Sequence, residues 1–99
     1  MNKTERQAYE QKMEARLQKW DAQMQELKAR AGEASADAKA ELGRRLRELE
    51  TRSEATKSKL RELRESGDAA WQDVKAGLEA SWSALDNAMR SARSRFSGD

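Results

Sequence analysis

Apolar side chains in the first third of the chain recur at the spacing of a heptad repeat. Their steps alternate between four and three residues, at Met13, Leu17, Trp20, Met24, Leu27, Ala31 and Ala34. This spacing is typical of a helix that packs along one side in a coiled coil. The flanking positions, such as Glu14, Arg16 and Asp21, are charged or polar. The stripe is therefore narrow and fits one partner helix better than two.

A second stripe follows in the middle of the chain. It consists of Leu46, Leu49, Ser53, Thr56, Leu60 and Leu63. Between the two stripes, the residues Ala34, Ala38, Leu42 and Leu46 are each four positions apart. A helix with this spacing must rotate its stripe or bend between about residues 34 and 46.

The last third of the chain has the broadest apolar face. It carries Trp71, Val74, Leu78, Trp82, Leu85, Met89, Ala92 and Phe96. Several of these residues recur at intervals of eleven, a spacing that keeps the stripe nearly straight along a helix. Its width predicts contact with two other helices, with Trp82 at the middle of the buried face.

Turn residues divide the chain at two places. Ser66, Gly67 and Asp68 form the clearer interruption, where Gly67 can adopt the left-handed conformation and Asp68 can cap the next helix. A tight turn at 66–68 and a helix from about 68 to 96 are therefore predicted. The weaker interruption is at Gly32, and one glycine inside a helix costs only about 1 kcal/mol relative to alanine. Thr4, with Gln7 three residues later, predicts the start of the first helix.

These signals predict an all-α protein, a long antiparallel coiled coil or helical bundle formed by a single domain of residues 1–99. In the first arrangement residues 4–65 form one long, straight helix, with a possible hinge near 31–38 left unbent, and pack against a second copy. In the alternative, the chain bends at Gly32 into a monomeric three-helix bundle with segments 4–31, 35–65 and 68–96. A domain swap relates the two arrangements. The narrow stripes and the helix-forming residues of 31–38 favour the dimer.

Composition supports long helices and argues against catalysis. Hydrophobic residues make up 36% of the chain and charged residues 38%, and there is no proline, cysteine or histidine. Without histidine and cysteine, the usual general base, thiol nucleophile and zinc ligands are missing. The five glycines are scattered singly, so there is no phosphate-binding loop. We therefore expect a protein that is not an enzyme and that needs no cofactor or metal.

The charge pattern bears on partners and on location. The net charge is only +2, and basic residues of the middle segment, such as Arg44 and Lys57, alternate with glutamates. Such a surface releases few counterions, which argues against nucleic acid as a partner. There is no apolar run of membrane-spanning length and no apolar core of a signal peptide. A cytoplasmic location follows as an expectation.

The broad face of the last helix also suits a different class of function. With two tryptophans and Phe96, residues 69–96 could coat a membrane or a hydrophobic granule as an amphipathic helix. The polar face of such a helix is normally rich in lysine and arginine. Here it includes Asp73, Glu79 and Asp86, so burial in a bundle is preferred.

The segment Ala70–Trp82, which follows Ser66-Gly67-Asp68, resembles the carboxy-terminal signature of a family of small bacterial coiled-coil proteins associated with stress. Residues 18–22 and 36–41 also fit this resemblance. Gln72 and Ser83 depart from it, because acidic residues are commoner there. The resemblance implies a bacterial cytosolic protein induced by stress, and it carries no activity or cofactor. We therefore expect a homo-oligomeric coiled coil, with a second copy as partner and a structural, stress-related or adaptor role.

Overall fold

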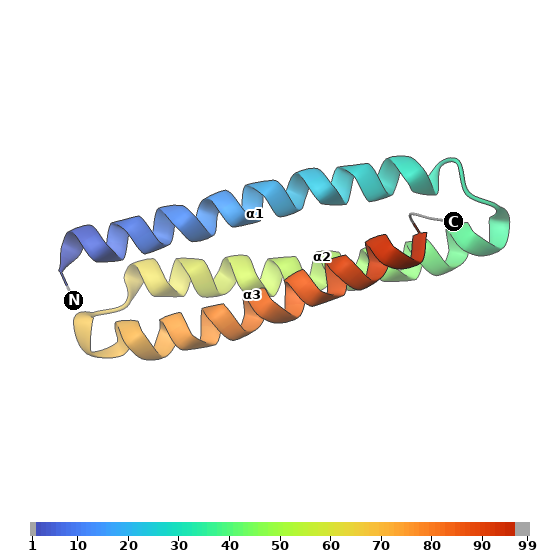
Figure 1. The fold of residues 1–99 in the computed structure, drawn as a ribbon. Helices are drawn as coiled ribbons and strands as arrows, with labels where there is room; N and C mark the ends of the chain where they lie inside the picture. Colours follow the sequence, from blue (N-terminus) through green and yellow to red (C-terminus); the bar gives the residue numbers. More distant parts are fainter. Residues whose placement is uncertain (1, 97–99) are drawn as a thin grey trace.

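The protein is all-α, as predicted. It is a bundle of three helices in which the second runs antiparallel to the first and the third (Figure 1). A computed structural model describes residues 2–96, with side chains as far as Arg95. The helices are α1 (Lys3–Ala31), α2 (Ala36–Glu65) and α3 (Asp68–Phe96). The bundle measures 51 × 18 × 17 Å. Helices α2 and α3 approach each other closely along their length, whereas α1 lies against α2 and makes few close approaches to α3.

The chain bends at residues 32–35, within the segment 31–38 where the sequence allowed a hinge. The single helix over 4–65 is therefore not present, and the chain has the bent arrangement given as the alternative. Ser35 causes the bend, because its backbone is extended (φ −64°, ψ 164°) and its side chain accepts a bond from the Ala38 amide at 3.4 Å. Serine readily leaves a helix to cap the next one. Folding back also gives the α1 stripe a partner within the same chain.

The helix ends differ in detail from the sequence predictions. Asn2, rather than Thr4, caps α1, and its side chain accepts a bond from the Glu5 amide at 2.8 Å. Gly67 does not adopt the left-handed conformation, because Ser66 ends α2 in an extended conformation (φ −75°, ψ 147°). The carbonyl of Gly67 accepts the first bonds of α3, from the amides of Ala70 and Trp71. Asp68 lies in the first turn of α3, where a negative charge is favoured by the helix dipole.

The three stripes meet in one apolar core. Its buried residues are Met13, Leu17, Trp20, Met24, Leu27, Leu49, Leu60, Leu63, Trp71, Leu78, Leu85, Met89 and Ala92. Leu46, Val74 and Trp82 are partly buried and pack against this core. The side chain of Phe96 lies outside the described residues. All three helices contribute to the core, so no helix is held by charged contacts alone.

Two positions of the second stripe place hydroxyl groups inside the bundle. Ser53 and Thr56 are both buried. The Thr56 hydroxyl donates to the carbonyl of Arg52 at 3.0 Å and lies 2.7 Å from the Ser81 hydroxyl of α3. This polar link joins α2 to α3 at mid-height. It helps to fix how the two helices are aligned, since a buried hydroxyl without a partner costs about 1–3 kcal/mol.

Trp82, at the middle of the α3 stripe, packs against the core but is only partly buried. The fully buried tryptophan of α3 is Trp71, which is 1% exposed. We expect Trp71→Ala to lower the free energy of unfolding by about 3–5 kcal/mol, the usual cost of removing a core aromatic ring. Trp82→Ala should cost about 1–2 kcal/mol, because its ring is already partly hydrated. Denaturant titrations followed by circular dichroism measure both values.

The exposed residue Ala80 provides the control for these variants. Ala80→Gln should change stability by less than about 0.5 kcal/mol. Equal losses for Trp71→Ala and Trp82→Ala would contradict the difference in burial on which this prediction rests.

Candidate functional site: the polar borders of α1

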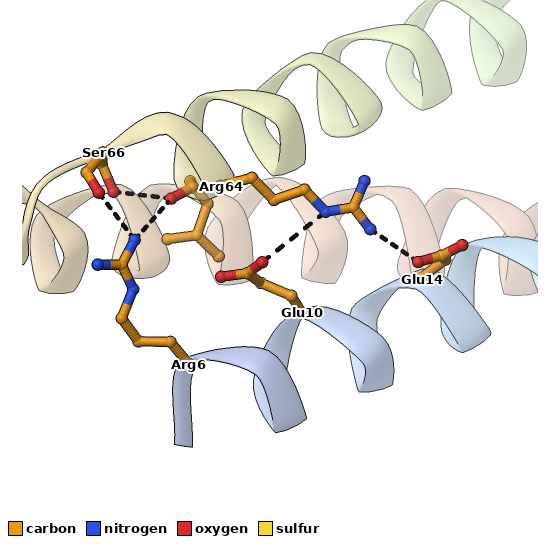
Figure 2. A network of polar contacts seen from close by, with 6 residues as sticks. Arg6, Glu10, Glu14, Arg64 and Ser66 are labelled. Atoms are coloured by element: carbon orange, nitrogen blue, oxygen red, sulfur yellow. Dashed lines mark hydrogen bonds and ion pairs between the residues drawn. The ribbon is translucent and has the colours of Figure 1, made fainter. Parts of the chain in front are cut away.

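Arg6 fastens the first turns of α1 to the turn between α2 and α3 (Figure 2). Its guanidinium donates to the carbonyl of Ser66 at 2.7 Å and to that of Leu63 at 3.5 Å. It also pairs with the Asp68 carboxylate at 2.9 Å and lies 5.6 Å from the centre of the Trp71 ring. The last carbonyls of a helix lack partners within the helix and carry its negative dipole end. The Leu63 carbonyl also accepts bonds from the amide and the hydroxyl of Ser66, so Arg6 caps the end of α2 mainly at the Ser66 carbonyl.

Ion pairs follow the border between α1 and α2. Arg64 pairs with Glu14 at 2.7 Å and with Glu10 at 3.8 Å (Figure 2). Farther along, Lys57 pairs with Asp21 at 3.4 Å, and Lys28 pairs with Glu50 at 2.9 Å. Most of these side chains are about half exposed, and such pairs contribute about 0–1 kcal/mol each. Their main effect is to align α1 with α2.

Aromatic and charged side chains pack between α1 and α3 near the amino ends of both helices. The ring of Tyr9 meets Trp71 edge to face, with 5.7 Å between centroids. The ammonium of Lys75 lies 4.7 Å from the Tyr9 ring centre and 5.4 Å from that of Trp71. Tyr9 donates its hydroxyl proton to Glu79, which also pairs with Arg16 at 3.3 Å. This cluster holds α1 and α3 together near their amino ends.

The environment of Tyr9 favours its neutral form. Burial raises the pKa of the Tyr9 phenol well above its usual value. The hydrogen bond to Glu79 and the negative charge of that carboxylate raise the pKa further, while Arg16 lowers it. The bundle is therefore stabilised by a protonated Tyr9.

Beyond this cluster, α1 and α3 border a groove of about 330 Å³. The residues that line it include Arg16, Lys19, Trp82, Asp86, Met89 and Arg93. The guanidinium of Arg16 lies 5.8 Å from the centre of the Trp82 ring. The groove thus combines an aromatic surface with several positive charges.

A second groove, of about 440 Å³, lies between α1 and α2. Trp20 and Ser53 both line it and are nearly fully buried. Neither the Trp20 Nε1 nor the Ser53 Oγ has a hydrogen-bond partner among the described residues. Unsatisfied buried groups of this kind reduce the stability of an interface. These two atoms therefore reduce what the contact between α1 and α2 contributes at this level; the Trp71 Nε1 of α3 is likewise without a partner among the described residues.

The structure gathers the predicted stripe residues into a core but does not arrange them as a reactive site. Within residues 2–96, we find no group of three or more histidine, cysteine, aspartate or glutamate residues that could hold a metal ion. Over the same residues, no helix combines the length and the apolar character needed to cross a membrane. The candidate site is thus a set of helix borders and grooves.

Sequence reasoning missed Arg6 and Tyr9. Tyr9 lies one helical turn before Met13 and extends the first stripe toward the amino end. That spacing was the available signal for Tyr9. Arg6 offered none, because its partners are backbone carbonyls about sixty residues away.

Comparisons with known proteins found no relative of this chain. No family model matches the chain, and no curated protein or solved structure matches it. The resemblance to small bacterial coiled-coil proteins therefore stays a prediction.

Arg6→Met tests the contact between α1 and the turn. The substitution keeps an apolar stem and removes the charged donor from the carbonyls of Leu63 and Ser66. We expect a loss of about 1–2 kcal/mol in unfolding free energy, the range for a charged hydrogen bond that is partly screened by solvent. Arg61→Met, at an exposed position of α2, should change stability by less than about 0.5 kcal/mol. Equal effects of the two substitutions in denaturant titrations would refute the capping role.

Tyr9 predicts how stability depends on alkaline pH. Its pKa is raised in the folded chain, so its contribution is complete below the ordinary tyrosine pKa of about 10 and declines as the pH rises above it. Because Tyr9 is the only tyrosine, near-ultraviolet absorbance of tyrosinate reports its ionisation alone. We expect ionisation to be delayed relative to free tyrosine and to accompany loss of helix. Glu79→Gln should reduce the delay. Ionisation at the ordinary pH with the helices intact would contradict the prediction.

Proposed function

We propose that this chain is a non-enzymatic coiled-coil protein that associates with a second copy by exchanging α1, and that it has a structural or adaptor role. A bacterial cytoplasmic location and a stress-related role are part of this proposal and rest on the resemblance of residues 70–82. The observation that supports self-association most strongly is the conformation of the hinge.

The hinge differs little from a helix. Gly32 has helical dihedral angles (φ −64°, ψ −23°). The amides of Gly32, Glu33 and Ala34 bond to carbonyls three residues earlier, at 3.0–3.3 Å. Such bonds are those of a tightened last helical turn. Ser35 is extended, so rotation near this residue would join α1 and α2 into one helix, roughly 90 Å long at about 1.5 Å per residue.

The attachment of α1 makes exchange feasible. Helix α1 contacts α2 through a narrow stripe, and its contacts with α3 are concentrated around Tyr9 and Arg16. In an exchanged dimer, α1 of one copy would make the same contacts with the α2–α3 hairpin of the other. The ion pairs Asp21–Lys57 and Lys28–Glu50 would then join two chains. Exchange therefore costs mainly the hinge rearrangement and the entropy of association.

The unsatisfied polar atoms of Trp20 and Ser53 lower the cost of opening, because water can reach them once α1 leaves. Once α1 has moved away, the α2–α3 hairpin also exposes its apolar stripe, including Leu49 and Leu60, to a helix from another protein. This supports an adaptor role by the same movement that supports dimer formation.

The alternative function is an amphipathic coat on a membrane or hydrophobic granule through residues 69–96. Trp71, Leu78 and Leu85 of this segment are at most 1% exposed in the bundle. The apolar face could meet a lipid surface only after both other helices had separated from α3. Self-association requires only α1 to move, so it is the better-supported proposal.

Two hinge substitutions should shift the association in opposite directions. Ala36→Pro suits the bundle, because proline is accepted in the first turn of a helix and favours an extended residue before it, as Ser35 is. It would disrupt a continuous helix and should hold the chain as an 11.2 kDa monomer. Ser35→Ala removes the cap, worth about 1 kcal/mol per chain. With two hinges per dimer, the association constant should rise roughly 30-fold.

Sedimentation equilibrium at micromolar concentrations measures both effects, and circular dichroism checks that each variant is helical. Ser58→Ala, on the exposed side of α2, serves as the matched control and should leave association unchanged. If the parent chain and Ser35→Ala both remain monomers throughout the concentration range, exchange of α1 is refuted.

A further inference from the structure

Trp82 occupies an unusual place for a large aromatic residue in a small bundle. It belongs to the broad apolar face of α3, yet it is only partly buried and borders the groove between α1 and α3. The guanidinium of Arg16 lies 5.8 Å from its ring centre, which is within the range of a cation–π contact. Trp82 packs against the core, whose neighbouring residues Leu78 and Leu85 are fully buried, while part of its own ring stays accessible.

The groove has an excess of positive charge. Arg16, Lys19, Arg90 and Arg93 line it, against the single carboxylate of Asp86. Arg90 pairs with Asp86 at 3.1 Å, and Arg16 pairs with Glu79 at 3.3 Å. Across residues 2–95, Lys19 and Arg93 take part in no ion pair. Two positive charges, one from each helix, are thus available to a ligand.

The apolar part of the groove consists of Trp82 and Met89. Met89 is almost fully buried and forms its floor, whereas Trp82 presents part of its ring. The volume of about 330 Å³ is at the lower end of the range for small-molecule sites. A flat or short apolar body could stack on Trp82 while a negative group reaches Lys19 and Arg93.

We propose that this groove binds small organic anions that carry an aromatic or short alkyl body. The body lies on Trp82, and the anionic group, a carboxylate or sulfonate, pairs with Lys19 and Arg93. A bare inorganic anion lacks the apolar contact and would remain hydrated at this open site. A bilayer would need several protruding apolar side chains, whereas Met89 is buried between helices.

This inference does not depend on the proposed exchange of α1. Lys19 comes from α1, and Trp82 and Arg93 come from α3. In the monomer one chain would form the whole site, and in an exchanged dimer two chains would form it together. Binding should therefore be retained in the Ala36→Pro variant, which holds the chain as a monomer.

Anilinonaphthalene sulfonate is a suitable probe, because it is an aromatic anion whose fluorescence increases in an apolar site. The parent chain should bind one probe molecule per chain in a saturable titration. The double substitution Lys19→Gln and Arg93→Gln should weaken binding about tenfold, since two exposed charge pairs together contribute roughly 1–2 kcal/mol. Trp82→Leu should weaken it by a similar factor. Lys39→Gln with Arg44→Gln makes the same charge change at exposed positions of α2 and should leave binding unchanged.

Competition with the bound probe distinguishes an organic anion from an inorganic one as the ligand. Naphthalene sulfonate, an aromatic anion, should displace the probe, whereas inorganic phosphate at the same concentration should not. Equal weakening by the two double variants, or displacement by phosphate as effective as by naphthalene sulfonate, would overturn the proposal. So would binding to phosphatidylglycerol vesicles without binding of the probe. Circular dichroism checks folding, and if Trp82→Leu unfolds, the Lys19 and Arg93 double variant decides the matter.

Discussion

Burial of the narrow apolar stripe of α1 is the interaction on which the rest of this structure depends. A polar helix of 29 residues is marginally stable in water unless its apolar side is covered. The α2–α3 hairpin covers it, with Leu17, Trp20 and Leu27 buried in the common core. Ion pairs on the border with α2 align the helices, and Arg6 caps the end of α2. These polar contacts are effective because the stripe has already brought the helices together.

The same constraint makes α1 the separable part of the bundle. A stripe that fits one helix can be covered equally well by the hairpin of a second copy or by the seam of another protein. Helices α2 and α3 are held more firmly, by close packing and by the buried contact between Thr56 and Ser81. The unsatisfied atoms of Trp20 in α1 and Ser53 in α2 border the groove between these two helices, and Trp71 in α3 also has an unsatisfied Nε1. We propose that stability is unevenly distributed among the three helices, in a way that favours opening at the hinge.

Much of the fold could be predicted from the spacing of apolar residues, because burial of a stripe depends on local periodicity. The turn at 66–68 was also visible, although Gly67 acts through its carbonyl rather than through a left-handed conformation. The bend at Ser35 was harder to decide, since helix propensity there is balanced by a weak cap. The extent to which Trp82 is buried could not be predicted from the spacing of apolar residues, because it depends on how closely α1 approaches α3. The contacts of Arg6 depend on the folded backbone, so no sequence pattern marks them.

Native-state hydrogen exchange tests the central claim, that α1 opens separately from the α2–α3 hairpin. Amides in the middle of α1 should exchange through an opening of lower free energy than amides in the middle of α2 and α3. This partial opening should respond weakly to denaturant, because it exposes only part of the core. Exchange of all three helices through one global unfolding, with the same free energy and the same denaturant dependence, would contradict the account.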